Sequence, residues 1–184
     1  MQIVTEKPEF SAAGESDPQK GDAAQGLGAW NDLEFGFCGN PRAKLDDRGR
    51  LKMPAEFKAF IEKKYGKDFN EFYITSQEGL DAEIYPLPEW RKRWAKLMSM
   101  PPADKARKEL VARYTLWGGK AEMDPQGRLL LPDELRSSGM MNEDVSVNGE
   151  GNVLRVTPVS RLRETVQGKP LADQHLDRLA QFGL

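Results

Sequence analysis

Cysteine and histidine are almost absent from this chain of 184 residues, which has only Cys38 and His175. A single cysteine excludes a disulfide within the chain, and we interpret Cys38 as a small buried apolar residue. The sequence has no Cys/His cluster with metal-ligand spacing, no Gly-x-x-x-x-Gly-Lys-Ser/Thr phosphate loop and no nucleophile elbow. Because an enzyme needs convergent reactive groups, the sequence predicts a protein that is not an enzyme and uses no metal or cofactor.

Long apolar runs are also missing. No stretch of about 18 apolar residues exists that could cross a membrane. The N-terminus does not have the basic and then apolar layout of a secretory signal. We therefore expect a cytoplasmic protein that does not contact a membrane.

Neither sign of charge is in large excess, since 27 basic and 29 acidic residues give a formal net charge of −2. The two signs are unevenly spread. Residues 1–35 have two lysines against seven acids, whereas residues 41–67 have nine bases against four acids and residues 88–113 have eight against three. Because the local field governs the encounter with a phosphate backbone, this distribution is compatible with DNA binding despite the negative total.

One stretch of the sequence, residues 43–56, occurs a second time 78 residues later, at 121–134. The ungapped matches are Ala43/Ala121, Asp46/Asp124, Gly49/Gly127, Arg50/Arg128, Leu51/Leu129, Pro54/Pro132 and Glu56/Glu134. An internal repeat constrains the architecture before any single residue is interpreted. We therefore predict two copies of one structural unit.

Each copy is expected to fold as a strand, a turn and a second strand. The Asp–Gly frame supplies the turn, with glycine where a positive φ is needed, and proline ends the second strand. The aspartate and the arginine four residues later can pair across this turn. We assign a structural role in the turn to residues shared by the two copies: Asp46, Gly49, Pro54, Asp124, Gly127 and Pro132.

The match resumes after a gap, where residues 72–75 and 84–88 align with residues 145–147 and 156–160. Each unit is therefore interpreted as strand–turn–strand, a short helix, a β-hairpin and a helix that opens at proline. Between the units, apolar residues at helical spacing predict two helices separated by Pro101-Pro102. The predicted segments are a disordered acidic extension (1–34), the first repeat (35–87), a helical pair (88–115), the second repeat (116–165) and a C-terminal helix (166–184).

The Asp-x-x-x-Arg turn, followed by a short strand and proline, resembles the AbrB/SpoVT swapped-hairpin unit. Two such units joined by Tyr85-Pro86-Leu87-Pro88-Glu89-Trp90 and a helical segment resemble the MraZ family of bacterial DNA-binding regulators, over residues 35–165. The resemblance implies an α+β fold in which duplicated AbrB/SpoVT-like hairpins form a β-barrel with helices packed outside.

The same resemblance carries expectations about function. Members of that family assemble into ring-shaped homo-oligomers. The resemblance implies a repressor of the division and cell-wall gene cluster that binds tandem short repeats in its own promoter. The nucleoid is then the place where the protein works, and double-stranded DNA and further copies of itself are its partners.

The first copy has bases where the second has none, and these predict the site. Lys44, Arg48 and Lys52 stand where the second copy has Glu122, Gln126 and Leu130. With Arg50 they place four bases within nine residues, all of one parity, which project to one side if the turn keeps strand register. Lysines would neutralise phosphates, and an arginine can contact guanine through two hydrogen bonds in the major groove. The structural alternative is a solvated hairpin face.

Arg50 has two interpretations that the residues alone leave open. Because it is shared with Arg128, it can be the ion-pair partner of Asp46 and no more. The resemblance assigns the Gly-Arg arginine of the first motif to DNA contact. We treat Arg128 as mainly structural, adding to DNA binding if both repeats face one surface.

Two other functions remain as alternatives. One is a non-enzymatic oligomeric scaffold that binds acidic partners or coats DNA without sequence preference. The other is an antitoxin with an AbrB-like head, which predicts a disordered toxin-binding C-terminal tail. The second folded repeat counts against the antitoxin. A preference for native promoter DNA over scrambled DNA would separate the regulator from the scaffold.

Overall fold

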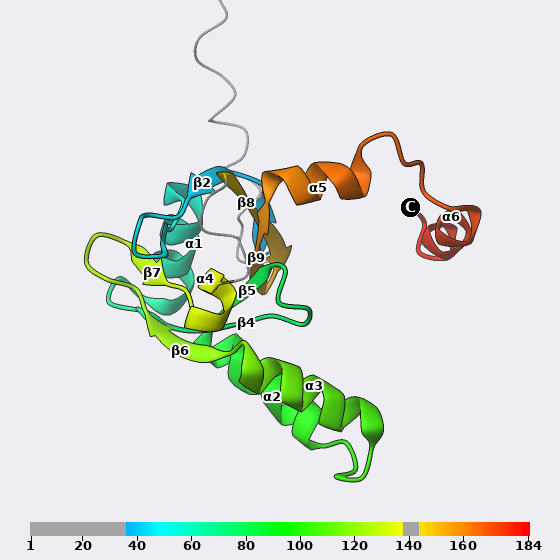
Figure 1. Cartoon of the computed structure of the whole chain (residues 1–184), viewed down its shortest axis with the longest axis horizontal. Coiled ribbons are helices and arrows are strands. Elements are labelled where there is room, and N and C mark those ends of the chain that lie inside the picture. Colours follow the sequence, from blue (N-terminus) through cyan, green and yellow to red (C-terminus); the bar gives the residue numbers. More distant parts are fainter. Residues whose placement is uncertain (1–35, 138–143) are drawn as a thin grey trace, which may run out of the picture.

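The computed structural model of the chain describes residues 36–137 and 144–184 (Figure 1). The extension predicted for residues 1–34 lies outside these residues. The described part is a mixed α+β structure with antiparallel strands. Its first half contains β1 (Phe37–Gly39), β2 (Arg42–Lys44), β3 (Arg50–Lys52), α1 (Ala55–Tyr65), β4 (Glu71–Thr75) and β5 (Ala82–Pro86).

Two helices, α2 (Leu87–Met98) and α3 (Lys105–Leu116), follow the first half and project from the body as an antiparallel pair (Figure 1). The second half then repeats the order of the first. It contains β6 (Gly119–Glu122), β7 (Arg128–Leu130), α4 (Asp133–Ser137), β8 (Asp144–Gly151), β9 (Val153–Pro158) and α5 (Val159–Val166), and α6 (Asp173–Ala180) comes last.

The two halves exchange strands. In the larger sheet the order is β1-β8-β9-β5-β4-β6, and β2 also pairs with β8. The first-half strand β2 lies on the second-half strand β8, with Ala43 opposite Val145. The second-half strand β6 lies on the first-half strand β4, with Ala121 opposite Phe72. The opening strand of each half therefore finds its partner only in the hairpin of the other half.

Two contacts lie on an approximate twofold axis that relates the halves. Strands β3 and β7 form a separate two-stranded sheet in which Leu51 pairs with Leu129, its own equivalent in the repeat. Strands β5 and β9 pair with Glu83 opposite Arg155, which are 72 residues apart, as are the aligned residues of this part of the repeat. An Arg155–Glu83 ion pair of 3.1 Å strengthens the second contact. The sequence repeat thus becomes a pseudo-symmetric structure.

The expected barrel does not form among the described strands. The larger sheet has two free edges, at β6 and at β1–β2, and only an isolated bridge between Leu45 and Leu51 links it to the β3–β7 pair. The physical reason is the path of the chain after each turn. Beyond each turn, β3 and β7 pair with each other and not with an edge of the larger sheet. The prediction of a barrel was therefore wrong.

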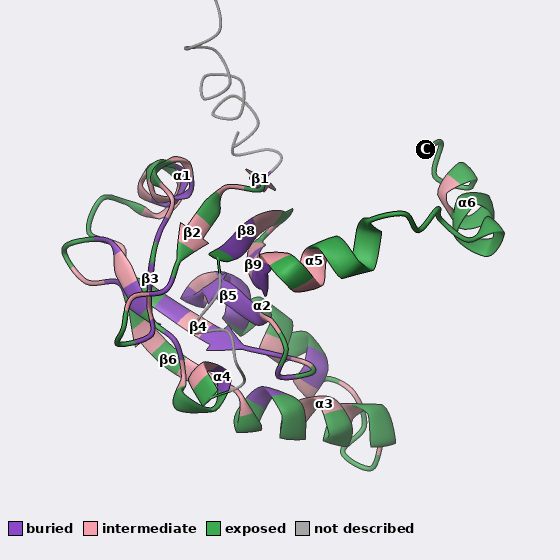
Figure 2. Cartoon of the chain, turned by 45° about the horizontal axis from the view of Figure 1, so that its top comes forward, coloured by how far each residue is buried: buried purple, intermediate pink, exposed green. Residues whose placement is uncertain are grey.

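The core lies between the larger sheet, the β3–β7 pair and helices α1 and α4 (Figure 2). Leu51, Leu129 and Leu135 are fully buried there, as are Phe57 and Ile61 on α1. Burial of such a side chain is worth about 1.5–3 kcal/mol. The apolar side of the β3–β7 pair is therefore anchored to the core, which leaves its other side free to face solvent.

Helix α1 follows from its local sequence. Pro54 immediately precedes its first turn, where a missing N–H costs nothing. Phe57, Phe60 and Ile61 recur at helical spacing and are buried. Gly66, with φ of 103°, ends the helix in a conformation that other residues rarely adopt. The proline and glycine positions in the sequence predict this helix to within a residue or two.

Helices α2 and α3 have a small aromatic core of their own. Trp90 stacks on Tyr73 of β4, with ring centroids 4.1 Å apart, and its edge meets Tyr114 of α3 at 5.2 Å. The Asp104 side chain accepts a 3.1 Å hydrogen bond from the Arg107 N–H and caps α3. The Trp/Tyr cluster therefore ties the helical pair to the sheet.

The C-terminal segment differs from the rest of the fold. Helices α5 and α6 extend from the body in Figure 1, and none of their residues is buried in the described chain. No helix of residues 36–137 and 144–184 is long and apolar enough to span a membrane.

Candidate nucleic-acid interface

The two-stranded sheet of β3 and β7, with the turns 45–49 and 123–127, is named the ribbon below. Along β3, Leu51 is buried while Arg50 is half-buried and Lys52 exposed, and β7 alternates in the same way around Leu129. Arg50 lies opposite Leu130 and Lys52 opposite Arg128. Paired residues of an antiparallel sheet project to the same face. The outer face of the ribbon therefore has three basic side chains and one leucine.

The two turns of the ribbon are built alike. In the first turn Asp46 Oδ1 accepts the N–H groups of Arg48 (3.0 Å) and Arg50 (2.9 Å), and Oδ2 accepts Arg50 Nε at 2.7 Å. In the second turn Asp124 accepts the Arg128 N–H at 2.9 Å and Arg128 Nε at 2.7 Å. The shared aspartate and arginine therefore hold each turn by both backbone and side-chain contacts.

Glycine completes both turns. Gly49 has φ of 75° and Gly127 φ of 76°, the left-handed region in which a side chain costs about 1–2 kcal/mol. Each donates a 2.8 Å hydrogen bond to the carbonyl of the aspartate three residues earlier. Pro54 and Pro132 follow the ribbon strands and lead into α1 and α4. The shared residues thus occupy the positions that the turn geometry needs.

The turn contacts also change the acidity of the two aspartates. Hydrogen bonding from the Arg50 N–H, against some cost of burial, lowers the pKa of Asp46 below its ordinary value. For Asp124, burial opposes ionisation, but hydrogen bonds from the Arg128 side chain and N–H outweigh it and also lower the pKa. Both carboxylates are therefore ionised at neutral pH and hold the arginine guanidinium groups in place.

The two turns are joined to each other across the pseudo-twofold axis. Met53 donates to the Gly127 carbonyl at 2.8 Å, and its equivalent Leu131 donates to the Gly49 carbonyl at 3.1 Å. Side chains add contacts to equivalent carbonyl groups of the two turns. Lys52 Nζ donates to the Gln126 carbonyl, and an Arg136 nitrogen donates to the Arg48 carbonyl at 3.3 Å. The ribbon is thus one connected unit with contributions from both halves.

The structure places the predicted basic residues in two settings. Lys44, Arg48 and Lys52 are exposed, and Lys44 forms a 3.1 Å ion pair with Asp144 that is itself exposed. Arg50 and Arg128 are half-buried in their turns. Lys44 lies on β2, outside the ribbon, but lines one surface groove together with Lys52. Arg48 lies in the first turn, where its carbonyl accepts the bond from Arg136.

Sequence reasoning missed three basic residues near the ribbon. Arg42 is exposed on β2 two residues before Lys44, and the strand parity that selected Lys44 could have found it. Lys58 of α1 and Arg136 of α4 are equivalent positions, 78 residues apart. The ungapped repeat, followed one helical turn past the prolines, would have identified both.

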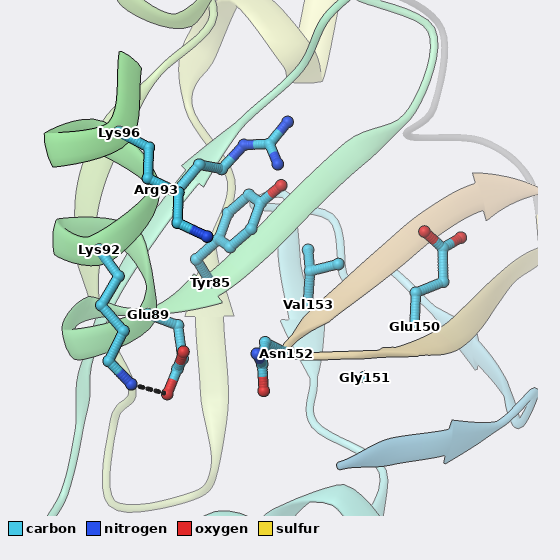
Figure 3. A pocket seen from close by; sticks show the side chains of 9 residues that line it. All are labelled: Tyr85, Glu89, Lys92, Arg93, Lys96, Glu150, Gly151, Asn152 and Val153. Carbon is cyan, nitrogen blue, oxygen red and sulfur yellow. Dashed lines mark hydrogen bonds and ion pairs between the residues drawn. The ribbon is translucent and has the colours of Figure 1, made fainter. Parts of the chain in front are cut away.

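A second basic surface lies on α2, beside a cleft of about 450 Å³ between this helix and the β8–β9 turn (Figure 3). Several of its charged groups form contacts within the chain. Glu89, although buried, accepts bonds from Lys92 (3.0 Å) and the Tyr65 hydroxyl (3.1 Å), and these outweigh burial and lower its pKa. Arg93 Nε donates to the Tyr114 hydroxyl at 2.8 Å. This surface is less well suited to reading DNA than the ribbon.

The chain is similar to proteins named transcriptional regulator MraZ. It is 40% identical over 148 residues to that protein of Acidobacterium capsulatum, a match that covers 80% of this chain and 99% of the relative. The corresponding protein of Koribacter versatilis is 34% identical over 148 residues with the same coverage. The chain belongs to the MraZ family.

The family resemblance inferred from the sequence is thereby confirmed. A more distant MraZ, from Shewanella oneidensis, is 28% identical over 156 residues and is also covered over 99% of its length. No protein-family model matches the chain. This member of the MraZ family is longer than these relatives, because each alignment leaves about a fifth of the chain unmatched.

Proposed function

We propose that this MraZ-family chain is a DNA-binding transcriptional regulator that reads double-stranded DNA with the ribbon. One observation carries the proposal: an exposed basic face on a two-stranded antiparallel sheet, anchored to the core from behind. The major groove, about 12 Å wide, accepts either a helix or a two-stranded β-ribbon. The relatives, named transcriptional regulators, support the same function.

The ribbon supplies a separate role for each basic residue. Lys44, Arg48 and Lys52 are exposed and suited to phosphates, which position a protein without reading sequence. Arg50 is suited to a guanine, because Asp46 engages its Nε and a guanidinium can also donate from its two terminal nitrogens. An arginine held in this way loses less conformational freedom on binding. Arg128 has the same bond to its aspartate in the second turn and adds to the contact, although one of its terminal nitrogens also donates to the Gln126 side chain at 3.1 Å.

The finer features of the function belong to the same proposal. The duplicated AbrB/SpoVT-like fold is supported by the reciprocal exchange of β2 and β6 between the halves. The segments 35–87, 88–115 and 116–165 are its first repeat, helical pair and second repeat.

A ring-shaped homo-oligomer would present many ribbons to DNA. Tandem short repeats in the promoter would bind several ribbons of one ring, so that each contact after the first is intramolecular. Repression of the division and cell-wall gene cluster, at the nucleoid, is the proposed outcome.

A fluorescence-anisotropy titration tests the proposal. Purified protein is titrated into DNA from upstream of its own gene and into a scrambled control, each at two salt concentrations. A preference for the native DNA that survives the higher salt is expected of a sequence-reading regulator. Equal affinity for both DNAs that collapses with salt would leave only electrostatic coating of DNA. No binding to either would favour an acidic protein partner.

The pair Arg50→Ala and Arg128→Ala separates reading from folding, because the two arginines have matching ion pairs of 2.7 Å with their aspartates. We expect Arg50→Ala to lose the preference for native DNA, a change worth about 1–3 kcal/mol. Arg128→Ala should weaken binding less and destabilise the turn to a similar extent. Circular dichroism and gel filtration check the fold and the assembly. Loss of structure in Arg50→Ala alone would assign Arg50 to the fold.

A further inference from the structure

Two surface grooves of the described chain are copies of each other. The first groove, of about 420 Å³, lies between β2, β3 and the start of α1, and the second, of about 470 Å³, between β6, β7 and the start of α4. The first is lined by Arg42, Ala43, Lys44, Lys52, Met53, Pro54, Ala55 and Lys58. The second is lined by Gly119, Lys120, Ala121, Glu122, Leu130, Leu131, Pro132 and Asp133. Apart from Lys58 and Gly119, the two sets correspond residue by residue at the 78-residue spacing of the repeat.

The floors of the grooves are alike but their charges are not. Ala43 and Pro54 of the first groove have identical equivalents in the second. The polar lining of the first groove consists of four basic side chains and no acidic one, whereas that of the second has one lysine against Glu122 and Asp133. Since pseudo-symmetry makes the shape of the two grooves similar, the charge difference is a property of the first groove and not of the fold.

The first groove is continuous with the outer face of the ribbon. Lys52 belongs to both, because it projects from β3 beside Arg128 and also lines the groove. A Cβ at Gly127 would lie 3.7 Å from Lys52 Nζ and 3.6 Å from Lys58 Cδ. The groove therefore opens beside the second turn of the ribbon, within reach of a duplex that the ribbon contacts.

The bases of the first groove are available to an anion, although Lys52 also donates to the Gln126 carbonyl. Lys44 pairs with Asp144 at 3.1 Å and Lys58 with Glu62 at 3.6 Å, and all four side chains are at least one-third exposed. Exposed ion pairs contribute about 0–1 kcal/mol, so a phosphate can replace the carboxylate at little cost. Arg42 lies on the same face of β2 as Lys44. The second groove attracts a phosphate less, because it has one lysine beside Glu122 and Asp133, and Asp133 is paired with Arg136.

We propose that the first groove, and not the second, binds the sugar–phosphate backbone of DNA beside the major groove that the ribbon enters. The inference rests on the proposed function and adds the residues Arg42 and Lys58 to it. It also predicts in which of two orientations the chain lies on the duplex. The backbone of the ribbon is nearly symmetric about the pseudo-twofold axis, so a single phosphate-binding groove, together with the bases that only the first turn has, orients the chain on the duplex.

The salt dependence of DNA binding tests the inference, because each phosphate that a basic side chain neutralises adds about 0.9 to the slope of log K against log salt. The double variant Arg42→Gln with Lys58→Gln should lower this slope by about 2 units for each chain that contacts the DNA and leave the ratio of affinities for native and scrambled DNA unchanged. The matched control is Lys120→Gln, which removes the equivalent of Arg42 from the second groove. It should leave both the slope and the ratio unchanged.

Each outcome of this test has a separate meaning. If the parent protein prefers its native DNA but the double variant keeps the parent slope, the inference fails while the proposed function stands. A decrease of the slope by about 1 unit in Lys120→Gln would also overturn it, because the grooves would then act alike. If the parent protein binds no DNA, the proposed function fails and the inference fails with it. Circular dichroism of the double variant, whose substitutions are at the surface, checks that the fold is retained.

Discussion

The same aspartate–arginine turn occurs twice in this molecule with the same distances. Arg50 and Arg128 each donate Nε to an aspartate oxygen at 2.7 Å, so the bond itself does not distinguish the two turns. The residues beside the two arginines do distinguish the turns. Arg48 and Lys52 border the first arginine, where the second copy has Gln126 and Leu130. A residue shared by the copies thus supports the turn, and we propose that the residues that differ decide which turn meets DNA.

The lowered pKa values of Asp46 and Asp124 predict an acid-sensitive turn. A carboxylate whose folded pKa is depressed stabilises the protein above its unfolded pKa, and this contribution is lost as the pH falls through the folded pKa. Asp46→Asn should therefore lower the urea midpoint at pH ~7. The difference from the parent should shrink as the pH falls from ~5 to ~2. Asp124→Asn is the matched variant, and a difference independent of pH in both would show that the charge does not stabilise the turn.

At the scale of the element, the ribbon depends on one pair of equivalent leucines. Leu51 and Leu129 face each other on the pseudo-twofold axis, and both are fully buried. Because the backbone bonds from Met53 and Leu131 flank this pair, a cavity here would loosen both turns together. The stability of the ribbon and the placement of its basic face are thus linked.

We predict that Leu51→Ala and Leu129→Ala each lower the free energy of unfolding by about 2–5 kcal/mol. Their effects should be similar in size, because the sites are equivalent, and non-additive in the double variant, because the residues are in contact. Urea denaturation measures all three values. Leu130→Ala, at a position that is 48% exposed on the other face of β7, is the control and should change stability by about 0.5 kcal/mol or less. A large decrease in the stability of the control would mean that the outer face is also packed.

Most elements and the pairing within each β-hairpin could be predicted from the sequence, but the contacts between more distant elements could not. Pro54 and Gly66 mark the limits of α1, and the Asp–Gly frames mark both turns, since these residues act on the local backbone. Strand alternation reveals which face of β2 is buried but not which strand lies beside it. The exchange of β2 and β6 and the open sheet depend on contacts between the halves, and the grouping of Arg42 with Lys58 depends on how β2, β3 and α1 pack within the first half. The sequence alone therefore does not predict these contacts.

At the scale of the whole molecule, neither half contains the partners of all its strands, although β4 pairs with β5 and β8 with β9 inside a half. Residues 36–116 include β1, β2 and β3, which pair with β8 and β7 of the second half. We predict that residues 36–116 expressed alone show no cooperative unfolding, and that co-expression with residues 117–184 restores it. Near-ultraviolet circular dichroism during thermal unfolding distinguishes these states. A cooperative transition in the isolated first half would show that its strands find other partners within that half.

The strand exchange also constrains how the protein is made. Strands β1 and β2 leave the ribosome early, but their partner β8 begins only at Asp144, about 100 residues after β2 ends at Lys44. At a synthesis rate of about 5–20 residues per second, these strands wait about 5–20 s with unpaired backbone groups. Their shortness and the charged Arg42 and Lys44 at the edge are features that hinder pairing with other nascent chains. The basic residues suited to holding a phosphate can therefore also protect the chain before its second half exists.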